Sequence, residues 1–315
     1  MHAQLHRRTV VVGVDGSDQA LHAVRWGAAE AERWRVPLRL VTAFGLLIDH
    51  APDRLHTEDR YRRALLHRAR RYLAEAAVEA AQQDRRIEVE QQLLVGHPLS
   101  VLVAESRHAR LVVIGDRGQS RIEGLLLGSV AVGLAVHAHC PVIVVRGAGE
   151  EKPDAAAGPV VVGVDGSANG DAALAFAFEA AAVRHAPLVA VHAWADLMID
   201  PLLRSAADLA EIEVTERELL VERLAGWVLK YPDVVVKQVV ACSRPAGMLV
   251  EQASRAQLLV VGSRGRGEFS GMLLGSVSHA VLHRAPCPVA VVRPDAKSAR
   301  VEASTEISDG DRGAG

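Results

Sequence analysis

Short apolar runs alternate along this chain with longer segments in which apolar residues recur every three or four positions. The runs are rich in valine, isoleucine and leucine, which is typical of strands buried on both faces of a parallel sheet. The segments between them have the period of amphipathic helices. We predict strands at residues 9–14, 38–44, 87–95, 111–114 and 142–146, and again at residues 160–164, 188–193, 234–241, 258–261 and 289–293.

The helix expected after the first strand has Ser17 or Asp18 as its N-cap, because short polar side chains accept hydrogen bonds from the first helical N–H groups. Further helices are predicted at residues 59–83, 99–107 and 129–137. Alternating strands and helices indicate an α/β fold with doubly wound parallel sheets and right-handed crossovers. The apolar face of the first helix consists of Ala20, Leu21, Val24, Ala28 and Ala31.

The chain contains two copies of one domain. The sequence VVVGVDGS at residues 10–17 recurs at residues 160–167, and CPV at residues 140–142 recurs at 287–289. The offset is 150 residues at first and 147 from Gly96 and Ser243 onward, so one short insertion separates the copies. We therefore predict a domain at residues 1–146, a linker at 147–158, a second domain at 159–294 and a disordered tail at 295–315.

A glycine pattern, G-x2-G-x9-G-S, follows the fourth predicted strand of each copy. Glycines between a strand and a helix let backbone N–H groups surround an anion, and the helix N-terminus adds positive potential. The alternative is a set of ordinary turn glycines. The first half has no lysine before Lys152 and the second half has no G-x4-G-K-[ST], so neither loop is a Walker A phosphate loop. The pattern consists of Gly115, Gly118, Gly128 and Ser129, and of Gly262, Gly265, Gly275 and Ser276.

An Asp-Gly-Ser sequence follows the first strand of each copy, at Asp15 and Asp165. Parallel sheets bind ligands beyond the carboxyl ends of their strands, at the point where the strand order reverses. If the first and fourth strands are neighbours, the aspartate loop and the glycine loop face one crevice. The carboxylates could accept hydrogen bonds from ribose hydroxyls, and the alternative is that they form only the local turn and cap.

Composition narrows the choice of partners and compartment. Half the residues are apolar and the net charge is −2, so nothing in the charge favours nucleic acid or an acidic membrane surface. No apolar stretch approaches the roughly 18 residues that a membrane helix needs, and residues 1–8 lack the core of a signal peptide. The three cysteines have no metal-binding spacing. We expect a cytoplasmic protein without a membrane or nucleic-acid partner.

Taken together, these motifs resemble the universal stress protein family. The resemblance rests on VVGVDGS, on Gly96-His97-Pro98, on the glycine patterns and on the Cys-Pro-Val-x-Val-Val endings, and it covers nearly the whole chain. It is closest in type to the tandem two-domain members found in actinobacteria. It implies two Rossmann-like domains, each with a five-stranded parallel sheet in the order 3-2-1-4-5 and one ATP, bound alone or with Mg²⁺.

The resemblance also implies roles for individual residues. Asp15 and Asp165 would meet the ribose, while the backbone of Ala43 and Ala193 would meet adenine. The glycine patterns would hold the triphosphate. The complete set of candidate nucleotide-binding residues is Gly13, Asp15, Ala43, Gly115, Gly118, Gly128, Ser129, Gly163, Asp165, Ala193, Gly262, Gly265, Gly275 and Ser276.

Asp116 is a departure that distinguishes the two copies, because the second copy has Ser263 at that position. A carboxylate beside phosphates costs Coulomb energy unless it points to water or binds through Mg²⁺. We therefore expect the second site to bind ATP at least as tightly as the first. Arg117 and Arg264, inside the loops, could clamp a phosphate or remain solvated or dimer-facing, and both alternatives stay open.

Two further positions depart from the family. The acidic residue that the family often places before its fourth strand is Arg110 in one copy and Gln257 in the other, and Gly96 becomes Ser243. His137 and His139 could bind metal, but the second copy has no matching histidines, so exposed helix-end side chains are the favoured interpretation.

Nothing in the sequence indicates efficient catalysis, since no repeated histidine or glutamate lies inside the glycine loops. We expect an ATP-binding regulatory protein of the stress or dormancy response, without catalytic or metal-binding residues. The alternative is a slow ATPase or phosphotransferase whose turnover is the signal. The apolar fifth strands, at residues 142–146 and 289–293, predict edge-to-edge pairing, either between the domains of one chain or in a homodimer.

Overall fold

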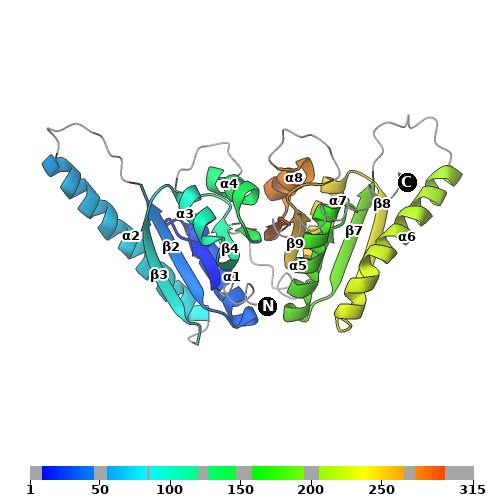
Figure 1. The fold of residues 1–315 in the computed structure, drawn as a ribbon, viewed down its shortest axis with the longest axis horizontal. Coiled ribbons are helices and arrows are strands. Elements are labelled where there is room, and N and C mark those ends of the chain that lie inside the picture. Colours follow the sequence, from blue (N-terminus) through cyan, green and yellow to red (C-terminus); the bar gives the residue numbers. More distant parts are fainter. Residues whose placement is uncertain are drawn as a thin grey trace, which may run out of the picture.

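The computed structural model describes residues 9–45, 55–83, 86–119, 127–146, 158–194, 206–265 and 274–294. Ten strands form one sheet in the order β3-β2-β1-β4-β5-β10-β9-β6-β7-β8, so each half has the predicted 3-2-1-4-5 order (Figure 1). The two halves are therefore tandem α/β domains with parallel sheets. The predicted tail and most of the predicted linker lie outside the described residues.

The first domain contains β1 (Thr9–Gly13), α1 (Asp18–Trp34), β2 (Leu38–Phe44), α2 (Leu55–Gln83), β3 (Val89–Val95), α3 (Pro98–Glu105), β4 (Ala109–Gly115), α4 (Ser129–His137) and β5 (Val142–Val145). The second contains β6 (Val160–Gly163), α5 (Ala168–Arg184), β7 (Leu188–Trp194), α6 (Ala206–Lys230), β8 (Val236–Cys242), α7 (Pro245–Gln252), the 3₁₀ helix η4 (Ala253–Arg255), β9 (Leu258–Gly262), α8 (Ser276–Arg284) and β10 (Val289–Val292).

The predicted elements are confirmed, with small differences at their ends. Ser17 is the N-cap of α1, because its hydroxyl accepts a hydrogen bond from the Ala20 N–H at 3.2 Å, and Asp18 is the first helical residue. Helix α3 begins one residue earlier than expected, at Pro98, where a missing N–H costs nothing. Helix α2 begins at Leu55, four residues before the predicted start at Asp59.

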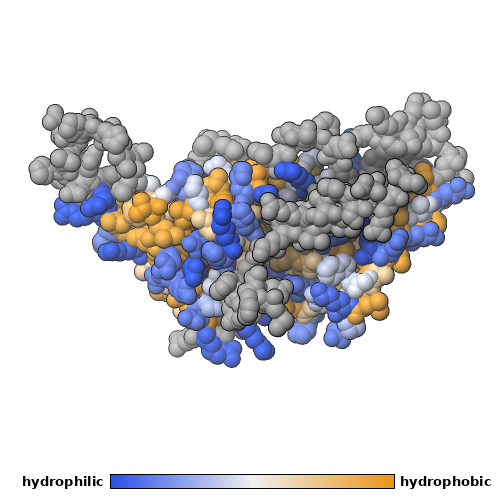
Figure 2. Space-filling view, viewed as in Figure 1, coloured by the Kyte–Doolittle hydropathy of each residue, from blue (hydrophilic) through white to orange (hydrophobic). Residues whose placement is uncertain are grey.

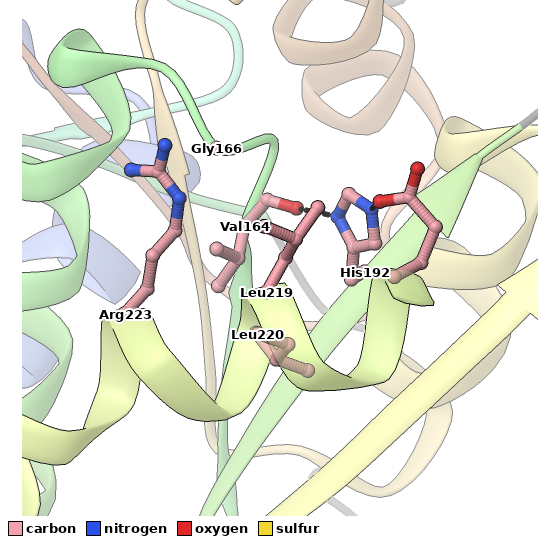
Figure 3. Close-up of a pocket in the computed structure, with 7 residues that line it drawn as sticks. Val164, Gly166, His192, Leu219, Leu220 and Arg223 are labelled. Carbon is pink, nitrogen blue, oxygen red and sulfur yellow. Dashed lines mark hydrogen bonds and ion pairs between the residues drawn. The ribbon is translucent and has the colours of Figure 1, made fainter. Parts of the chain in front are cut away.

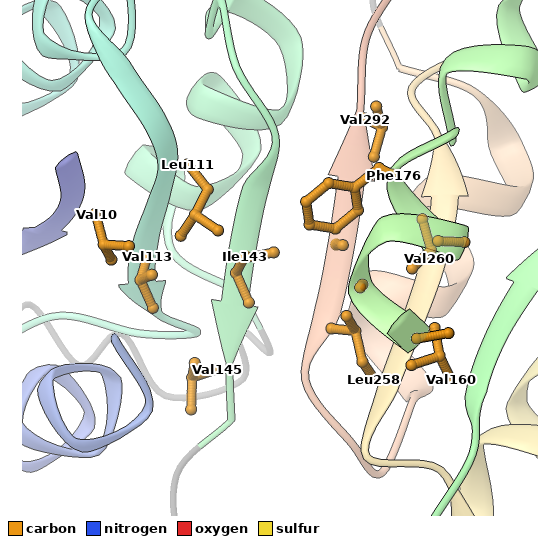
Figure 4. Packing of buried hydrophobic residues seen from close by; sticks show 14 of the residues in the cluster. Val10, Leu111, Val113, Ile143, Val145, Val160, Phe176, Leu258, Val260 and Val292 are labelled. Carbon is orange, nitrogen blue, oxygen red and sulfur yellow. The ribbon is translucent and has the colours of Figure 1, made fainter. Parts of the chain in front are cut away.

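Two apolar cores lie on the two faces of the sheet. Helices α1, α2, α5 and α6 cover one face, and α3, α4, α7 and α8 cover the other. Each core includes side chains from both domains. On the first face, Figure 4 shows Val113 and Ile143 of one domain, and Phe176 and Val260 of the other. The burial of apolar surface therefore continues across the domain boundary.

The two domains join through their fifth strands. β5 and β10 pair antiparallel, with Val144 opposite Val289 and Val142 opposite Val291. Since β4 and β9 occupy the other sides of these strands, the predicted edge-to-edge pairing is made within one chain. The described strands that remain at the edges of the sheet are β3 and β8.

A buried ion pair reinforces this junction. The Arg184 guanidinium of α5 lies 2.6 Å from the Glu30 carboxylate of α1, and the two side chains are 2% and 0% exposed. Burial lowers the pKa of Arg184, and the nearby Glu30 opposes that change. Removing one partner of such a pair leaves a buried charge, which typically costs about 3–5 kcal/mol.

Arg110 makes a second contact between the domains. Its guanidinium lies 3.6 Å from the centre of the Trp34 ring and 3.2 Å from the Glu179 carboxylate of α5. Cation–π stacking and an ion pair thus hold Arg110 at the contact between the two domains. No helix among the described residues has the length and apolar character needed to cross a membrane.

Candidate functional site

In each domain the aspartate loop and the glycine loop follow two neighbouring strands, and we call the place between these loops the crevice of that domain. β1 pairs with β4, and β6 pairs with β9, as the crevice hypothesis required. In the first domain the Gln119 N–H, inside the glycine loop, donates to Asp15 Oδ2 at 2.8 Å. The aspartate loop and the glycine loop are therefore in direct contact.

One oxygen of each aspartate forms the local turn. Asp15 Oδ1 accepts from the Ser17 N–H at 3.0 Å and from the Ser17 hydroxyl at 2.6 Å. Asp165 Oδ1 makes the same two bonds with Ser167, at 3.0 and 2.7 Å. The turn-forming role is thus real. The ribose contact stays a prediction, and Oδ2 is the oxygen that faces the glycine loop.

The glycines next to these carboxylates permit a close approach. A Cβ added at Gly118 would lie 2.5 Å from Asp15 Oδ2, and one added at Gly265 would lie 2.6 Å from Asp165 Oδ2. Real Cβ atoms do not come so close to other heavy atoms, so each loop needs glycine at this position. Gly16 and Gly166, with φ of +83° and +74°, complete the aspartate turns in a conformation that favours glycine.

Each glycine loop is closed at its base by one backbone hydrogen bond. The Gly128 N–H donates to the Asp116 carbonyl at 2.7 Å, and the Gly275 N–H donates to the Ser263 carbonyl at 2.8 Å. Helices α4 and α8 then begin at Ser129 and Ser276, without a side-chain cap. Both serine side chains are exposed. Residues 120–126 and 266–273, in the middle of the loops, lie outside the described part.

The remaining predicted glycines have packing roles. A Cβ at Gly13 would lie 3.0 Å from Leu102 of α3, and one at Gly163 would lie 3.1 Å from Leu249 of α7. A Cβ at Gly115 would lie 2.9 Å from the backbone of Gln19. These contacts account for glycine there without a ligand. Gly262 ends β9 at the rim of the second crevice.

Ala43 and Ala193 lie near the carboxyl ends of β2 and β7. The Val41 carbonyl, two residues before Ala43, accepts from the Val14 N–H at 2.8 Å. Peptide groups alternate in direction along a strand, so those of Ala43 point to the same side. β1 ends at Gly13, so no strand pairs with the Ala43 backbone on that side. The Ala43 backbone therefore faces the crevice. In the second domain the Val164 N–H donates to the Val191 carbonyl at 2.9 Å, which places the Ala193 backbone in the same way.

Tyr72 belongs to the first crevice, although no sequence pattern predicts it. A Cβ on Gly16 would overlap its ring, and the Tyr72 hydroxyl accepts from the Gln119 side-chain amide at 2.7 Å. Gln119 thus bridges α2 and Asp15. Tyr72 lies on a helix far along the chain, and no local pattern marks it.

His192 belongs to the second crevice. Figure 3 shows its ring between the Val164 carbonyl, 2.6 Å from Nδ1, and the Glu216 carboxylate, 2.8 Å from Nε2. Arg223 lines the same small pocket together with Gly166. The 150-residue offset pairs His192 with Thr42, whose hydroxyl donates to the Val14 carbonyl at 2.9 Å. That comparison between copies could have identified His192.

Charge distinguishes the two loops. Asp116 is only 4% exposed; its Oδ2 lies 3.6 Å from Arg117 Nε, and its Oδ1 has no hydrogen-bond partner within the described residues. Arg146 lies near enough that Asp116 raises its pKa, although burial lowers that pKa more. In the second loop Ser263 carries no charge. Burial and the neighbouring Arg264 both lower the pKa of Arg293 there.

The described residues contain no cluster of three or more histidine, cysteine, aspartate or glutamate side chains that could hold a metal ion. His137 and His139 are exposed at and just after the end of α4.

Comparison with known proteins agrees with this architecture. The family profile described as "Universal stress protein family" matches residues 6–146 and 157–293. The chain belongs to the universal stress protein family. A universal stress protein of Mycobacterium bovis is 41% identical over 291 residues, which cover 90% of this chain and 96% of that protein. One from Mycobacterium tuberculosis is 39% identical over 290 residues, which cover 90% and 96%.

Among solved structures, a universal stress protein from Archaeoglobus fulgidus covers 92% of this chain and 97% of its own, with a TM-score of 0.66 and 21% identity. This likeness extends over both domains. It supports the fold.

Proposed function

We propose that each domain of this universal stress protein binds one ATP, and that nucleotide occupancy regulates the protein during stress or dormancy in the cytoplasm. The observation that carries the proposal is the meeting of an aspartate turn and a glycine loop at the same place in both domains. A carboxylate oxygen would touch a Cβ placed on Gly118 or Gly265, at 2.5 and 2.6 Å. Duplicated loops with matched contacts favour a shared ligand.

The groups around each crevice suit the parts of ATP. The Asp15 and Asp165 carboxylates suit ribose hydroxyls, and the peptide groups of Ala43 and Ala193 suit the polar edge of adenine. The uncapped starts of α4 and α8 suit phosphate oxygens, because their N–H groups carry partial positive charge. Mg²⁺, when bound with ATP, would neutralise phosphate charge, and Asp116 would be its protein neighbour in the first crevice.

Binding is favoured over turnover because no described side chain is placed to activate a water molecule. His192 lines the same pocket as Gly166 of the second aspartate turn, and both of its ring nitrogens are engaged, with Val164 and Glu216. Phosphoryl transfer requires an oriented nucleophile as well as charge stabilisation. We therefore propose a regulatory role without efficient catalysis.

The test is nucleotide analysis of the purified full chain after denaturation, combined with calorimetric titration of nucleotide-free protein. We expect bound ATP and a stoichiometry of two per chain, reduced to one in Asp15→Ala or Asp165→Ala. Bound ADP with steady phosphate release would instead favour the slow ATPase. No nucleotide after purification and no heat of binding would overturn both.

A further inference from the structure

The two outermost helices, α2 and α6, carry opposite charges on matching segments. Residues 62–74 of α2 contain five arginines and one histidine but no acidic residue. Residues 211–222 of α6 contain five glutamates and one arginine. The helices follow the second strands of their domains and lie at opposite ends of the molecule (Figure 1). One chain therefore presents a basic end and an acidic end.

Most of this charge faces solvent. On α2 the side chains of Arg63, Arg68 and Arg70 are exposed, and on α6 those of Glu218 and Glu222 are exposed. Some of these charged side chains form ion pairs within their own helix. Arg71 lies 3.4 Å from Glu75, and Arg217 lies 2.9 Å from Glu213.

Helix α6 also exposes an apolar stripe. Val214, Val221 and Val228 are 57%, 48% and 41% exposed, and their spacing of seven residues places them on one side of the helix. Glu218 and Ala225 fall between them, which gives the alternating spacing of three and four that helices use to pack together. Figure 2 shows hydrophobic residues at the surface beside hydrophilic ones at the end that carries α6.

The second half of α2 is its counterpart. Val78 is 61% exposed, and Ala74 and Ala81 are exposed on the same side of the helix. On α2 the exposed arginines thus precede the exposed apolar side chains, and near the end of α6 Leu229 is 83% exposed. A parallel pairing of α2 with α6 places arginines beside glutamates and apolar side chains beside apolar side chains. An antiparallel pairing places arginines beside Val228 and Leu229.

We propose that α2 of one chain docks in parallel on α6 of a second copy. Because each chain has one of each helix, a twofold dimer makes the same contact twice and leaves no third copy to recruit. The fifth strands are already paired within the chain, so this surface is separate from the domain junction. The inference does not depend on nucleotide binding.

The test is sedimentation equilibrium of the full chain with two charge-reversal variants. We expect a dimer for the natural chain, weakened about tenfold or more as the salt concentration rises, because salt screens exposed charges. Arg63→Glu with Arg70→Glu makes both helices acidic, and Glu218→Arg with Glu222→Arg makes both basic. Each variant should be monomeric alone. Mixed together they should form a one-to-one heterodimer, since both contacts then join opposite charges.

Arg107→Glu with Arg255→Glu is the matched control, because it makes the same change in net charge at exposed positions on the other face. It should dimerise like the natural chain. Circular dichroism checks that each variant is folded. A natural chain that is monomeric at low salt would overturn the proposal. So would a dimer that neither reversal weakens, or folded reversal variants that fail to associate when mixed.

Discussion

The two crevices share a backbone frame but differ in charge. Both have an aspartate turn, a glycine loop closed by one hydrogen bond, and a helix that starts at an exposed serine. The first adds the buried Asp116, whereas the second has Ser263 there and Arg223 beside its aspartate turn. The two copies thus share the backbone geometry that would hold a nucleotide. They differ in the charges that would decide whether a nucleotide with one, two or three phosphates binds best.

The size of this difference can be bounded. A carboxylate about 5 Å from a phosphate charge is repelled by roughly 3 kcal/mol at an effective dielectric constant of about 20. Solvent and Mg²⁺ reduce that value. The comparison therefore predicts that the second crevice binds ATP more tightly than nucleotides with fewer phosphates. The first crevice should favour nucleotides with fewer phosphates unless Mg²⁺ is present.

The largest expected effect comes from removing each aspartate separately. Asp165→Ala should eliminate the tighter phase of ATP binding, and Asp15→Ala should leave it intact. The affinity of the altered site should fall about tenfold to a hundredfold, through lost hydrogen bonds and the lost turn. Calorimetric titration of both variants measures this. Equal or reversed residual affinities would contradict the proposed difference between the crevices.

Exchanging the loop charge should have the next largest effect. Asp116→Ser, made in an Asp165→Ala background, should tighten ATP binding at the first crevice about tenfold without Mg²⁺ and much less with it. Ser263→Asp, in an Asp15→Ala background, should weaken the second crevice similarly. AMP, with less charge, should respond less to either change.

Stability must be measured alongside this exchange, because Asp116 raises the pKa of the half-buried Arg146. Without the carboxylate, less negative charge offsets the cost of burying the Arg146 guanidinium. The melting temperature of Asp116→Ser should therefore fall. If ATP binding does not change while the fold is retained, Asp116 points away from the phosphates and the charge argument fails.

The sequence predicted the frame of each crevice and missed the side chains that distinguish the two. Apolar runs and glycine spacing are local patterns, so β1, β4 and the loops after them could be located in advance. Ser17 and Asp18 were equally good N-caps by composition, and only the observed bond to Ala20 decides between them.

Contacts between distant segments could not be predicted from the sequence. Glu30 follows two alanines in α1 and would be placed on a solvated face, yet it is 0% exposed because Arg184 of the other domain covers it. Tyr72 and Gln119 meet only because Tyr72 of α2 packs against Gly16, in the turn after β1. Such pairings depend on tertiary geometry, which the period of a helix does not encode.

The His192 position gives a smaller test of the comparison. His192→Thr retains a hydroxyl that can donate to the Val164 carbonyl, as Thr42 does to Val14, but it loses the contact with Glu216 of α6. We expect ATP binding at the second crevice to weaken about fivefold, since a side-chain hydrogen bond is worth roughly 1 kcal/mol. The first crevice should be unaffected. A change in the first crevice alone would contradict this role.

The smallest expected effect is at Tyr72. Tyr72→Phe keeps the ring over Gly16 and removes the oxygen that accepts from the Gln119 amide. Gln119 would then be held less firmly on Asp15 Oδ2, the oxygen proposed to meet ribose, and ATP should bind the first crevice about twofold to threefold tighter. Titration in an Asp165→Ala background isolates that site. Gln119→Ala should act in the same direction, because it removes the same bridge from the other side. If the two variants shift affinity in opposite directions, the bridge does not compete with the ligand, and Tyr72 only packs against the turn.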